Sequence, residues 1–394
     1  MKDQYKITIL VMWMTTLGQA AIALYLPAFP AIAASLHISP SVVKMTITVF
    51  LFGYGFSQLF YGPLSDRYGR KPILLIGISI FCLGCFINIF AHTEKIFLFA
   101  RLLQGLGCGS TITLGRSILR DCFTGRELAS AASYLSMGFA IGLGTTPLIG
   151  AYLQSYFGWQ ADFIFLLCSG LILLWILWRQ LPETSLNLNT KSGLFSQTLK
   201  DYKSILHHGI FWRFLLGGLF AYGVVVAYNV MTPFLIQNVL GYSAKFYGCL
   251  ALLVAIPYFS AASFNRKLVI TFGTGPIFAL GISLVLLGGF IMLLGVLSIK
   301  IHLIAIILPI MIATFGQALV FSNAISGALQ NFSPELGGKA SAIFSSLQML
   351  FISILSAMMT LPTDTTQVPL AVVLIGLGLF SGMVLYPQMN LVKN

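Results

Sequence analysis

The stretch GPLSDRYGRKP, residues 62–72, gathers four charged side chains in a chain that has very few. Asp66, Arg67, Arg70 and Lys71 lie here among two glycines and two prolines, whereas all 394 residues hold only 22 Lys and Arg and 10 Asp and Glu. The chain is 58% hydrophobic and 8% charged, while about a quarter of the residues of a soluble protein are charged. The lipid bilayer must therefore be the solvent for most of this chain.

Long apolar windows flank this charged loop and recur along the whole sequence. About 20 apolar residues suffice for one helix that spans the bilayer. Twelve windows meet this length, and we therefore expect an all-α membrane protein with twelve transmembrane helices. The windows cover residues 7–26, 42–61, 73–91, 96–118, 127–151, 161–180, 210–236, 245–264, 275–298, 302–329, 337–360 and 367–387.

The basic residues are distributed unequally between the loops. If the N-terminus is cytoplasmic, Lys44, Lys95, Lys245 and Lys300 fall on the far side and Arg101 falls within a span, which leaves 17 of the 22 Lys and Arg on the cytoplasmic side. This is the positive-inside bias of membrane proteins. The net charge of +12 then reflects topology and not a nucleic-acid partner. We expect a multi-pass protein of the inner membrane with both termini in the cytoplasm.

One polar connection, residues 181–209, divides six predicted spans from six. The loop after the second span also has a basic counterpart after the eighth, at residues 265–273. Two similar halves are typical of transporters that are built from structural repeats, with the substrate between the halves. We expect an N-terminal six-helix bundle at 1–180, a cytoplasmic linker at 181–209 and a C-terminal six-helix bundle at 210–394.

Metal, redox and enzyme chemistry find little support in the sequence. Cys82 and Cys85 form a CxxC motif inside an apolar span, but no second pair and no histidine accompanies them. Packing is the better interpretation of these two thiols. The chain has no phosphate-binding GxxxxGK[ST] motif and no cluster of His, Asp or Glu at membrane depth that an integral membrane enzyme would need. We expect no metal, no cofactor and no enzymatic activity.

Three motifs resemble signatures of the major facilitator superfamily. GPLSDRYGRK resembles the loop 2–3 signature GxLaDrxGrkxxL, and RLLQGLGCG, 101–109, resembles the fourth-span signature RxxQGxg. GLGTTPLIGAYL, 142–153, resembles the fifth-span antiporter signature less well, because Thr146 and Ala151 replace two glycines. The segments LYLPAFPAIAASLHIS, RDCFTG, FGW and LPET are similar to the twelve-span drug-exporting branch, especially its bicyclomycin and chloramphenicol resistance group. The resemblance covers the N-terminal half well and the C-terminal half mostly in hydropathy, and it implies the major facilitator fold.

The resemblance gives the charged loop a gating role between the two halves. Gly62 lets two helices approach closely, and Asp66 can meet the positive N-terminus of the eleventh span, for which Ser333 is the expected cap. The alternative is that the loop only anchors the chain at the membrane surface. The residues that we expect to act in gating are Gly62, Asp66, Arg67, Gly69, Arg70, Lys71, Arg120 and Pro147.

Arg101 and Asp162 are the candidates for proton coupling or charge sensing. A charge inside a span costs several kcal/mol, so Arg101 is expected to face a cavity or the bundle interior. The alternative is that Arg101, near the end of its span, extends to the membrane interface. Asp162 is the acid nearest to a span interior, although it can also serve only to cap the sixth span. Ala23 stands in span one where related exporters have an aspartate.

The absence of a mid-span carboxylate argues against a cationic substrate, because a buried carboxylate is the usual partner of a cation. Lys44 and Arg101 would make the cavity mildly positive instead. Polar side chains at membrane depth face other helices or the cavity. The residues that we expect to line the substrate cavity are Tyr25, Lys44, Arg101, Gln104, Asn229, Gln317 and Asn323.

These observations together predict a monomeric secondary active transporter in the lipid bilayer. It would move a small amphiphilic molecule by alternating access, as a proton-coupled exporter of drugs or metabolites that are neutral, zwitterionic or anionic. The alternative is a transporter of carboxylate metabolites or siderophores that imports its cargo or works without coupling. A transporter-like receptor or scaffold is a third reading, and the intact motif at 62–71 argues against it.

Overall fold

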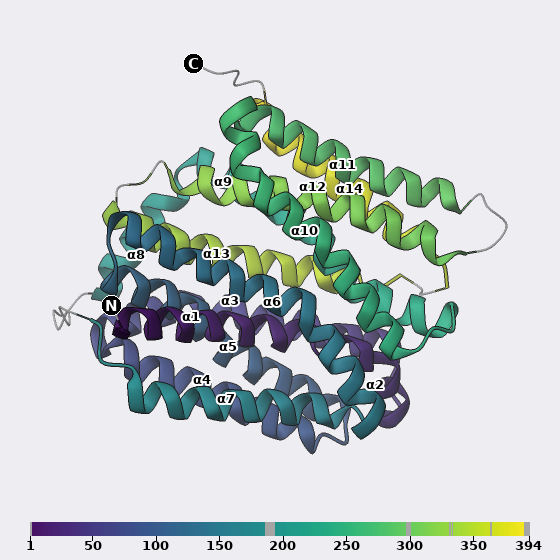
Figure 1. The fold of residues 1–394 in the computed structure, drawn as a ribbon, viewed down its shortest axis with the longest axis horizontal. Helices are drawn as coiled ribbons and strands as arrows, with labels where there is room; N and C mark the ends of the chain where they lie inside the picture. The colour runs from purple at the N-terminus through teal and green to yellow at the C-terminus, as the bar shows by residue number, and fades with distance from the viewer. Residues whose placement is uncertain are drawn as a thin grey trace.

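Helices form nearly all of the computed structural model, which describes residues 2–185, 194–296, 301–330, 332, 334–362 and 365–389 (Figure 1). These ranges contain no strand. Twelve helical segments are long and apolar enough to cross a membrane, which confirms the predicted number. The first is longer than the predicted window 7–26 and runs over Tyr5–Leu36, because a short helical turn continues it into a second helix.

The helices alternate in direction along the chain. The first six spans are α1 (Lys2–Ala23) with η1 (Leu26–Ala28) and α2 (Phe29–Leu36), α3 (Pro40–Tyr68), α4 (Arg70–Ile89), α5 (Glu94–Cys122), α6 (Gly125–Phe157) and α7 (Gln160–Gln180). After α8 (Leu194–Leu206) follow α9 (Gly209–Phe234) with the π-helical turn η2 (Leu235–Val239), α10 (Ala244–Phe272), α11 (Thr274–Gly295), α12 (Leu303–Leu329), α13 (Pro334–Met358) and α14 (Val368–Met389).

The two ends of the molecule are called the terminal side and the distal side. The terminal side holds the start of α1, the α3–α4 turn at Gly69 and helix α8, which lie together at the left of Figure 1. The distal side is the opposite end and holds the turns at residues 37–39, 90–93 and 240–243.

Short polar residues begin the helices on the distal side. Ser39 accepts a hydrogen bond from the Val42 backbone nitrogen at 3.4 Å, and Ser243 accepts one from the Phe246 backbone nitrogen at 3.2 Å. Such bonds satisfy backbone donors that have no partner within the helix. Pro40 follows Ser39 at the first helical position, where its missing N–H costs nothing.

Glycines allow the helices of the first half to pack closely. A Cβ atom on Gly105 of α5 would lie 2.1 Å from the Phe50 carbonyl oxygen of α3, and one on Gly107 would lie 2.3 Å from the Phe81 nitrogen of α4. Helix α5 therefore sits directly against two backbones, which only residues without a side chain permit. These glycines belong to the RLLQGLGCG motif, so part of that motif serves packing.

Two helix pairs join the first six spans to the last six. Helix α3 packs along α13, and α6 packs along α10. Since α3 and α13 are the second and eleventh spans and α6 and α10 the fifth and eighth, the two pairs are related by the repeat. The division of the chain at 1–180, 181–209 and 210–394 stays a prediction, and part of the linker, 186–193, lies outside the described residues.

The distal side is closed by contacts between the two sets of spans. The rings of Phe29 in α2 and Phe234 in α9 lie 6.0 Å apart between centroids. The Thr48 hydroxyl of α3 donates to the Ser356 hydroxyl of α13 at 2.9 Å. The ammonium of Lys245 in α10 lies 3.9 Å from the ring centroid of Tyr156 in α6. These contacts leave the space between the halves closed on the distal side.

Candidate substrate cavity and the cleft beside it

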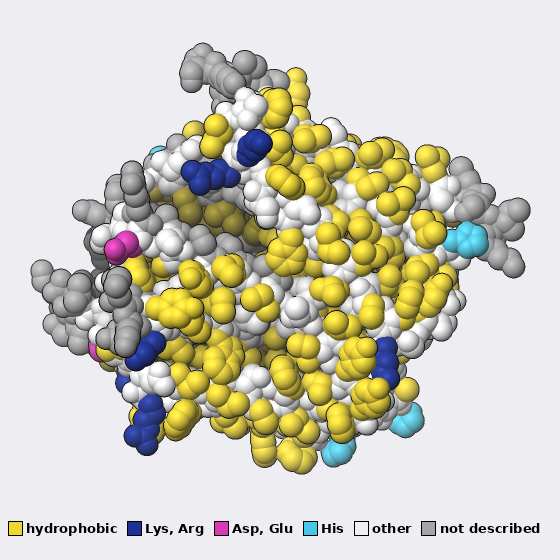
Figure 2. Space-filling view, in the orientation of Figure 1, with side chains coloured by type: hydrophobic (Ala, Val, Ile, Leu, Met, Phe, Trp, Pro, Cys, Tyr) yellow, Lys and Arg dark blue, Asp and Glu magenta, His cyan; other side chains and the backbone are white. Residues whose placement is uncertain are grey.

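A cavity of about 740 Å³ lies between the two sets of spans, in the half of the molecule toward the terminal side. This volume is within the range of small-molecule binding sites. Figure 2 shows a hollow in this half of the molecule. The cavity is lined by Thr15, Gln19, Tyr54, Gln58, Ile112, Arg116, Ala132, Leu135, Met137, Phe139, Ile141, Tyr222, Tyr258, Phe259, Ala262, Ser263, Phe321, Ser322, Ile325, Ser345, Gln348 and Met349.

The lining of this cavity is mostly apolar, with few polar groups. Aromatic rings come from both halves of the chain, including Phe139 and Tyr258, whose ring centroids lie 5.9 Å apart. Arg116 is the single charged residue in the described lining, which contains no Asp or Glu. A cavity of this composition suits an amphiphilic molecule that carries no strong positive charge.

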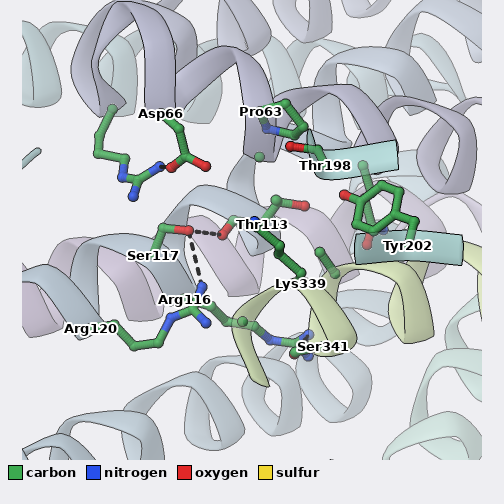
Figure 3. A pocket seen from close by; sticks show the side chains of 15 residues that line it. Pro63, Asp66, Thr113, Arg116, Ser117, Arg120, Thr198, Tyr202, Lys339 and Ser341 are labelled. Carbon is green, nitrogen blue, oxygen red and sulfur yellow. Dashed lines mark hydrogen bonds and ion pairs between the residues drawn. The ribbon is translucent and has the colours of Figure 1, made fainter. Parts of the chain in front are cut away.

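A smaller cleft of about 160 Å³ adjoins the cavity on the terminal side and is rich in charge. Its walls come from α3, the first residue of α4, α5, α8 and α13 (Figure 3). Asp66, Arg70, Arg116, Arg120 and Lys339 all line it. The cleft therefore lies where the first half, the linker helix and the second half meet.

Polar contacts cross this cleft from α5 and α8 to α13. Arg116 donates from Nη1 to the hydroxyls of Ser341 at 3.1 Å and Ser345 at 2.6 Å. The guanidinium of Arg120 lies against Gly338, where an added Cβ would be 2.0 Å from Nη1. Lys339 forms an ion pair with Asp201 of α8. These contacts tie α13 to the first half and to the linker helix.

Tyr202 of α8 closes one wall of the cleft. Burial, and to a lesser extent the negative charge of Asp66, raises the pKa of Tyr202 to about 12. The phenol is therefore neutral at physiological pH and adds a hydroxyl, not a charge, to the cleft.

The charged residues of GPLSDRYGRKP pair mainly within the first half. Arg70 forms an ion pair with Asp66, and its Nε donates to Asp121 at the end of α5 at 2.9 Å. Glu183, after α7, accepts from the backbone nitrogens of Arg70 at 2.8 Å and Lys71 at 3.2 Å. A carboxylate at the start of α4 satisfies its free backbone donors and complements its dipole.

Gly69 makes this arrangement possible. Its φ of +99° is a conformation that residues with a side chain rarely adopt. A Cβ there would also lie 2.5 Å from Oε2 of Glu183. The turn, the cap of α4 and the ion pairs of Arg70 therefore depend on one another.

Comparison with known proteins now places the chain in a family. The family model described as "Major Facilitator Superfamily" matches residues 10–356. The chain belongs to this superfamily. Its members are transporters and not enzymes, and they move small molecules across a lipid bilayer.

Several curated relatives of this superfamily member are named as drug-resistance proteins. It is 29% identical over 387 residues to multidrug resistance protein D of Escherichia coli (strain K12), covering 96% of this chain and 95% of the relative. It is 27% identical over 379 residues to a chloramphenicol resistance protein of Pseudomonas aeruginosa, covering 93% and 88%. These names match the drug-efflux branch that the sequence motifs indicate.

Solved structures of the superfamily share the fold of this chain. A D-xylose–proton symporter superposes with a TM-score of 0.78 over 96% of this chain and 97% of its own, at 15% identity. The xylose transporter XylE of E. coli, in a partially occluded inward-open conformation, gives a TM-score of 0.76 at 14% identity, covering 98% of each chain. Both likenesses bear on the fold alone.

The close approach predicted for Gly62 is wrong in this superfamily member. An added Cβ at Gly62 would have no atom within 4 Å, because Gly62 borders the open cleft. The close approach of α3 and α13 occurs two turns earlier, at Gly55, whose Cβ would lie 2.8 Å from the Leu350 nitrogen. Ser346 donates to the Gly55 carbonyl there at 2.7 Å. The two helices diverge between Gly55 and Gly62, and Arg116 and Arg120 of α5 line the cleft between them.

Asp66 shares the cleft with Gly338 and Lys339 near the start of α13. Its described partner is Arg70, and the expected cap Ser333 lies outside the described residues. Arg67 lies over the ring of Tyr68 at 5.2 Å and makes no described contact with α13.

Pro147 is buried, and its carbonyl faces Gly248 of α10, where a Cβ would lie 3.0 Å away. Pro147 thus lies at the second junction between the halves.

Arg101 is fully buried, so it does not extend to the membrane interface, and that alternative is wrong. Its Nη1 donates to Gln104 Oε1 at 2.6 Å and to the Ala21 carbonyl at 3.1 Å. Its guanidinium lies 4.3 Å from the ring centroid of Tyr25 and 4.4 Å from that of Phe50. Its Nε and Nη2 have no described hydrogen-bond partner.

Asp162 is also fully buried, and neither carboxylate oxygen has a described hydrogen-bond partner. It follows Trp159 at the start of α7, in a region packed with the rings of Phe97 and Phe163. A carboxyl group without partners is costly to bury in its charged form. The chain therefore holds a titratable group in an apolar site on the distal half of the molecule.

The seven residues predicted to line the substrate cavity are absent from the described lining of the large cavity. Tyr25, Lys44, Arg101 and Gln104 are fully buried in the closed distal half. Asn229 borders a separate cavity of about 20 Å³ together with Ala23 and Pro147. Gln317 is buried with both amide atoms unpartnered, and Asn323 pairs with Asn265 at 2.8 Å. For this conformation the predicted lining is wrong, because the open space lies nearer the terminal side.

Arg116, which lines both the large cavity and the cleft, is absent from the site residues predicted from the sequence. It falls inside the predicted window 96–118, but the positive-inside count assigns it to the cytoplasmic side. The signal that could have revealed it is a second arginine inside the fourth predicted span, with no acidic residue within three positions on either side.

Proposed function

We propose that the chain is a secondary active exporter that moves a small amphiphilic molecule by alternating access. The observation that carries this proposal is the large cavity between the halves, combined with closure on the distal side. A cavity that lies toward one side and is closed on the other is what the rocking of two repeats requires. We further propose that the protein acts as a monomer in the inner membrane.

The cytoplasm is the compartment that we assign to the terminal side. The excess of Lys and Arg in the terminal-side loops supports this, because such loops stay in the cytoplasm. The structure then corresponds to an inward-facing state in which cargo enters from the cytoplasm. The names of the relatives, multidrug resistance protein D and a chloramphenicol resistance protein, support export as the direction.

The cargo that we propose is neutral, zwitterionic or anionic. The absence of Asp and Glu from the described cavity lining supports this, because a desolvated cation needs a carboxylate partner. Ala23, where related exporters have an aspartate, is buried and borders only the small cavity. A carboxylate metabolite or a siderophore remains the second candidate cargo, and the arginine in the cavity wall favours it.

Proton coupling is proposed to act through Asp162, with Arg101 as the charge that senses the change. Both groups are buried with unpartnered polar atoms, and both lie in the half that would open when the transporter faces outward. Opening would hydrate Asp162 and let it exchange a proton, while closure would favour its neutral form.

Transport assays in proteoliposomes test this proposal. Counterflow of chloramphenicol should appear with the wild type, and an imposed pH gradient should accelerate it. Organic anions or neutral amphiphiles should compete better than tetraphenylphosphonium. Counterflow without any response to the pH gradient would remove proton coupling, and strongest competition by the organic cation would overturn the proposed substrate class.

A further inference from the structure

Arg116 is the one charged residue in the described linings that borders both the large cavity and the charged cleft. It and Gln58 are the two described residues that line both the large cavity and the charged cleft. Arg70, Arg120 and Lys339 line the cleft alone. A molecule in the cavity therefore meets one positive charge, on α5, at the boundary between the two spaces.

The charge of Arg116 has no carboxylate beside it in the described structure. Two other cations of the cleft do have acidic partners. Arg70 pairs with Asp66 and Asp121, and Lys339 pairs with Asp201. Arg116 donates only to the neutral hydroxyls of Ser341 and Ser345, and only from Nη1. Arg120, four residues further along α5, lines the same cleft and adds a like charge there. A partly desolvated cation without a counter-ion strongly favours an incoming anion.

Two amide side chains that line the cavity also have polar atoms without a described hydrogen-bond partner. The Oε1 atom of Gln58 and the Nε2 atom of Gln348 are buried and have no described hydrogen-bond partner. Both side chains line the cavity. The aromatic rings of Phe139, Tyr258 and Phe321 cover other parts of its wall. An acceptor, a donor, a cation and an apolar surface thus face the same space.

We propose that Arg116 binds the anionic group of the cargo, which is an aromatic or otherwise apolar carboxylate. This deepens the proposed function, on which it rests, by naming the recognition residue. The carboxylate accepts hydrogen bonds from Arg116. Arg116 then no longer donates to the hydroxyls of Ser341 and Ser345. Cargo binding then removes a link between α5 and α13. The amides of Gln58 and Gln348 bond the remaining polar groups of the cargo.

Matched aromatic probes test this site without knowledge of the natural cargo. The probes are 1-naphthylacetate, 1-naphthylacetamide and 2-(1-naphthyl)ethylamine, which share a ring and differ in charge. Their affinities are measured by titration of the purified full chain in neutral-lipid nanodiscs. We expect the wild type to bind the acetate about ten-fold more tightly than the amide, the scale of one charged hydrogen bond, and the amine most weakly.

Variants test whether Arg116 causes the preference for the acetate. Arg116→Gln should lose the preference for the acetate and keep the affinity for the amide, while Arg116→Lys should keep part of the preference. The double variant Ser341→Ala/Ser345→Ala should bind the acetate more tightly, by about five-fold, because it removes the competing acceptors. Arg179→Gln, on the exposed end of α7, is the matched control and should bind as the wild type does. If Arg116→Gln does not fold, Arg116→Lys and the serine variant carry the test.

The outcomes separate this inference from the proposed function. An acetate preference that Arg116→Gln abolishes supports the inference. Equal affinities of the wild type for acetate and amide, including the absence of binding, overturn it, and so does a preference that survives in Arg116→Gln. Counterflow of the amide without any acetate preference would leave the transporter function standing. Acetate preference without counterflow of any probe would instead count against transport while the anion site stands.

Discussion

Thr48 of α3 donates a hydrogen bond of 2.9 Å to Ser356 of α13, although the two residues are 308 positions apart. The bond joins the two halves on the distal side, near the fully buried Tyr25 and Arg101, which contact Thr46 and Phe50 of the same helix α3. Arg116 contacts the same helix, α13, from the terminal side. Helix α13 therefore has a polar contact with the first half toward each end. Under the proposed alternating access, we expect the contact at the end that opens to break.

The two glycines of α3 are expected to respond in opposite ways to alanine. Gly55→Ala should destabilise the protein by about 1–3 kcal/mol, the usual cost of overpacking, because the new Cβ would lie 2.8 Å from the Leu350 nitrogen. Gly62→Ala should be neutral or stabilising by up to about 1 kcal/mol, since alanine is the better helix former. Thermal unfolding of the two variants in one detergent measures the difference. Equal destabilisation by both would contradict the placement of the helix contact.

Asp66→Asn should leave insertion and folding intact but slow transport several-fold. Its carboxylate is 40% exposed and pairs with Arg70, and such pairs contribute only about 0–1 kcal/mol to stability. The effect on transport follows from the position of the pair in the cleft beside α13. Counterflow is compared with the amount of folded protein in the membrane. Unchanged counterflow would reduce GPLSDRYGRKP to a surface anchor.

Asp162→Asn should uncouple transport from the pH gradient and preserve counterflow. The amide fills the same space without a titratable proton, and the native carboxyl has no described hydrogen-bond partner to lose. Uptake driven by an imposed pH gradient and counterflow without one are measured side by side. Gradient-driven transport at the wild-type rate would remove Asp162 from the mechanism.

Arg101→Lys should impair transport by about ten-fold or more, although the charge is kept. Lysine cannot lie flat between the rings of Tyr25 and Phe50 while it bonds Gln104, as the planar guanidinium does. Gln104→Glu, which gives Arg101 an acidic partner, is the companion variant and should hold the closed distal cluster more firmly. Wild-type transport by Arg101→Lys would mean that the cluster has no part in the cycle.

The span pattern and the family could be predicted from the sequence, because both depend on local composition. Twenty apolar residues form a helix in lipid wherever they occur. The ion pair of Arg70 with Asp66 joins residues four positions apart, whereas the contacts of Arg70 with Asp121 and Glu183 needed the structure, because these partners follow other helices. The glycines of RLLQGLGCG needed the structure, because their packing partners Phe50 and Phe81 lie in other helices.

The cavity lining could not be predicted, because it depends on which side of the molecule is open. Polar residues at membrane depth look alike in sequence whether they meet a neighbour, as Asn323 meets Asn265, or face a cavity, as Gln58 does. Arg116 lies near the end of its window, where the sequence alone predicts a cytoplasmic position. The surroundings of Arg116 depend on the rotation of α5 and the approach of α13. The local sequence pattern determines neither.

The central claim, alternating access around the large cavity, is tested most directly by locking the distal contact. The double variant Thr48→Cys/Ser356→Cys, made in a background without the exposed native thiols Cys168 and Cys249, is oxidised in proteoliposomes and assayed for counterflow. We predict that cross-linking stops counterflow and that reduction restores it, while either single variant is unaffected by oxidant. Counterflow that continues at the wild-type rate when the two cysteines are fully cross-linked would contradict the account.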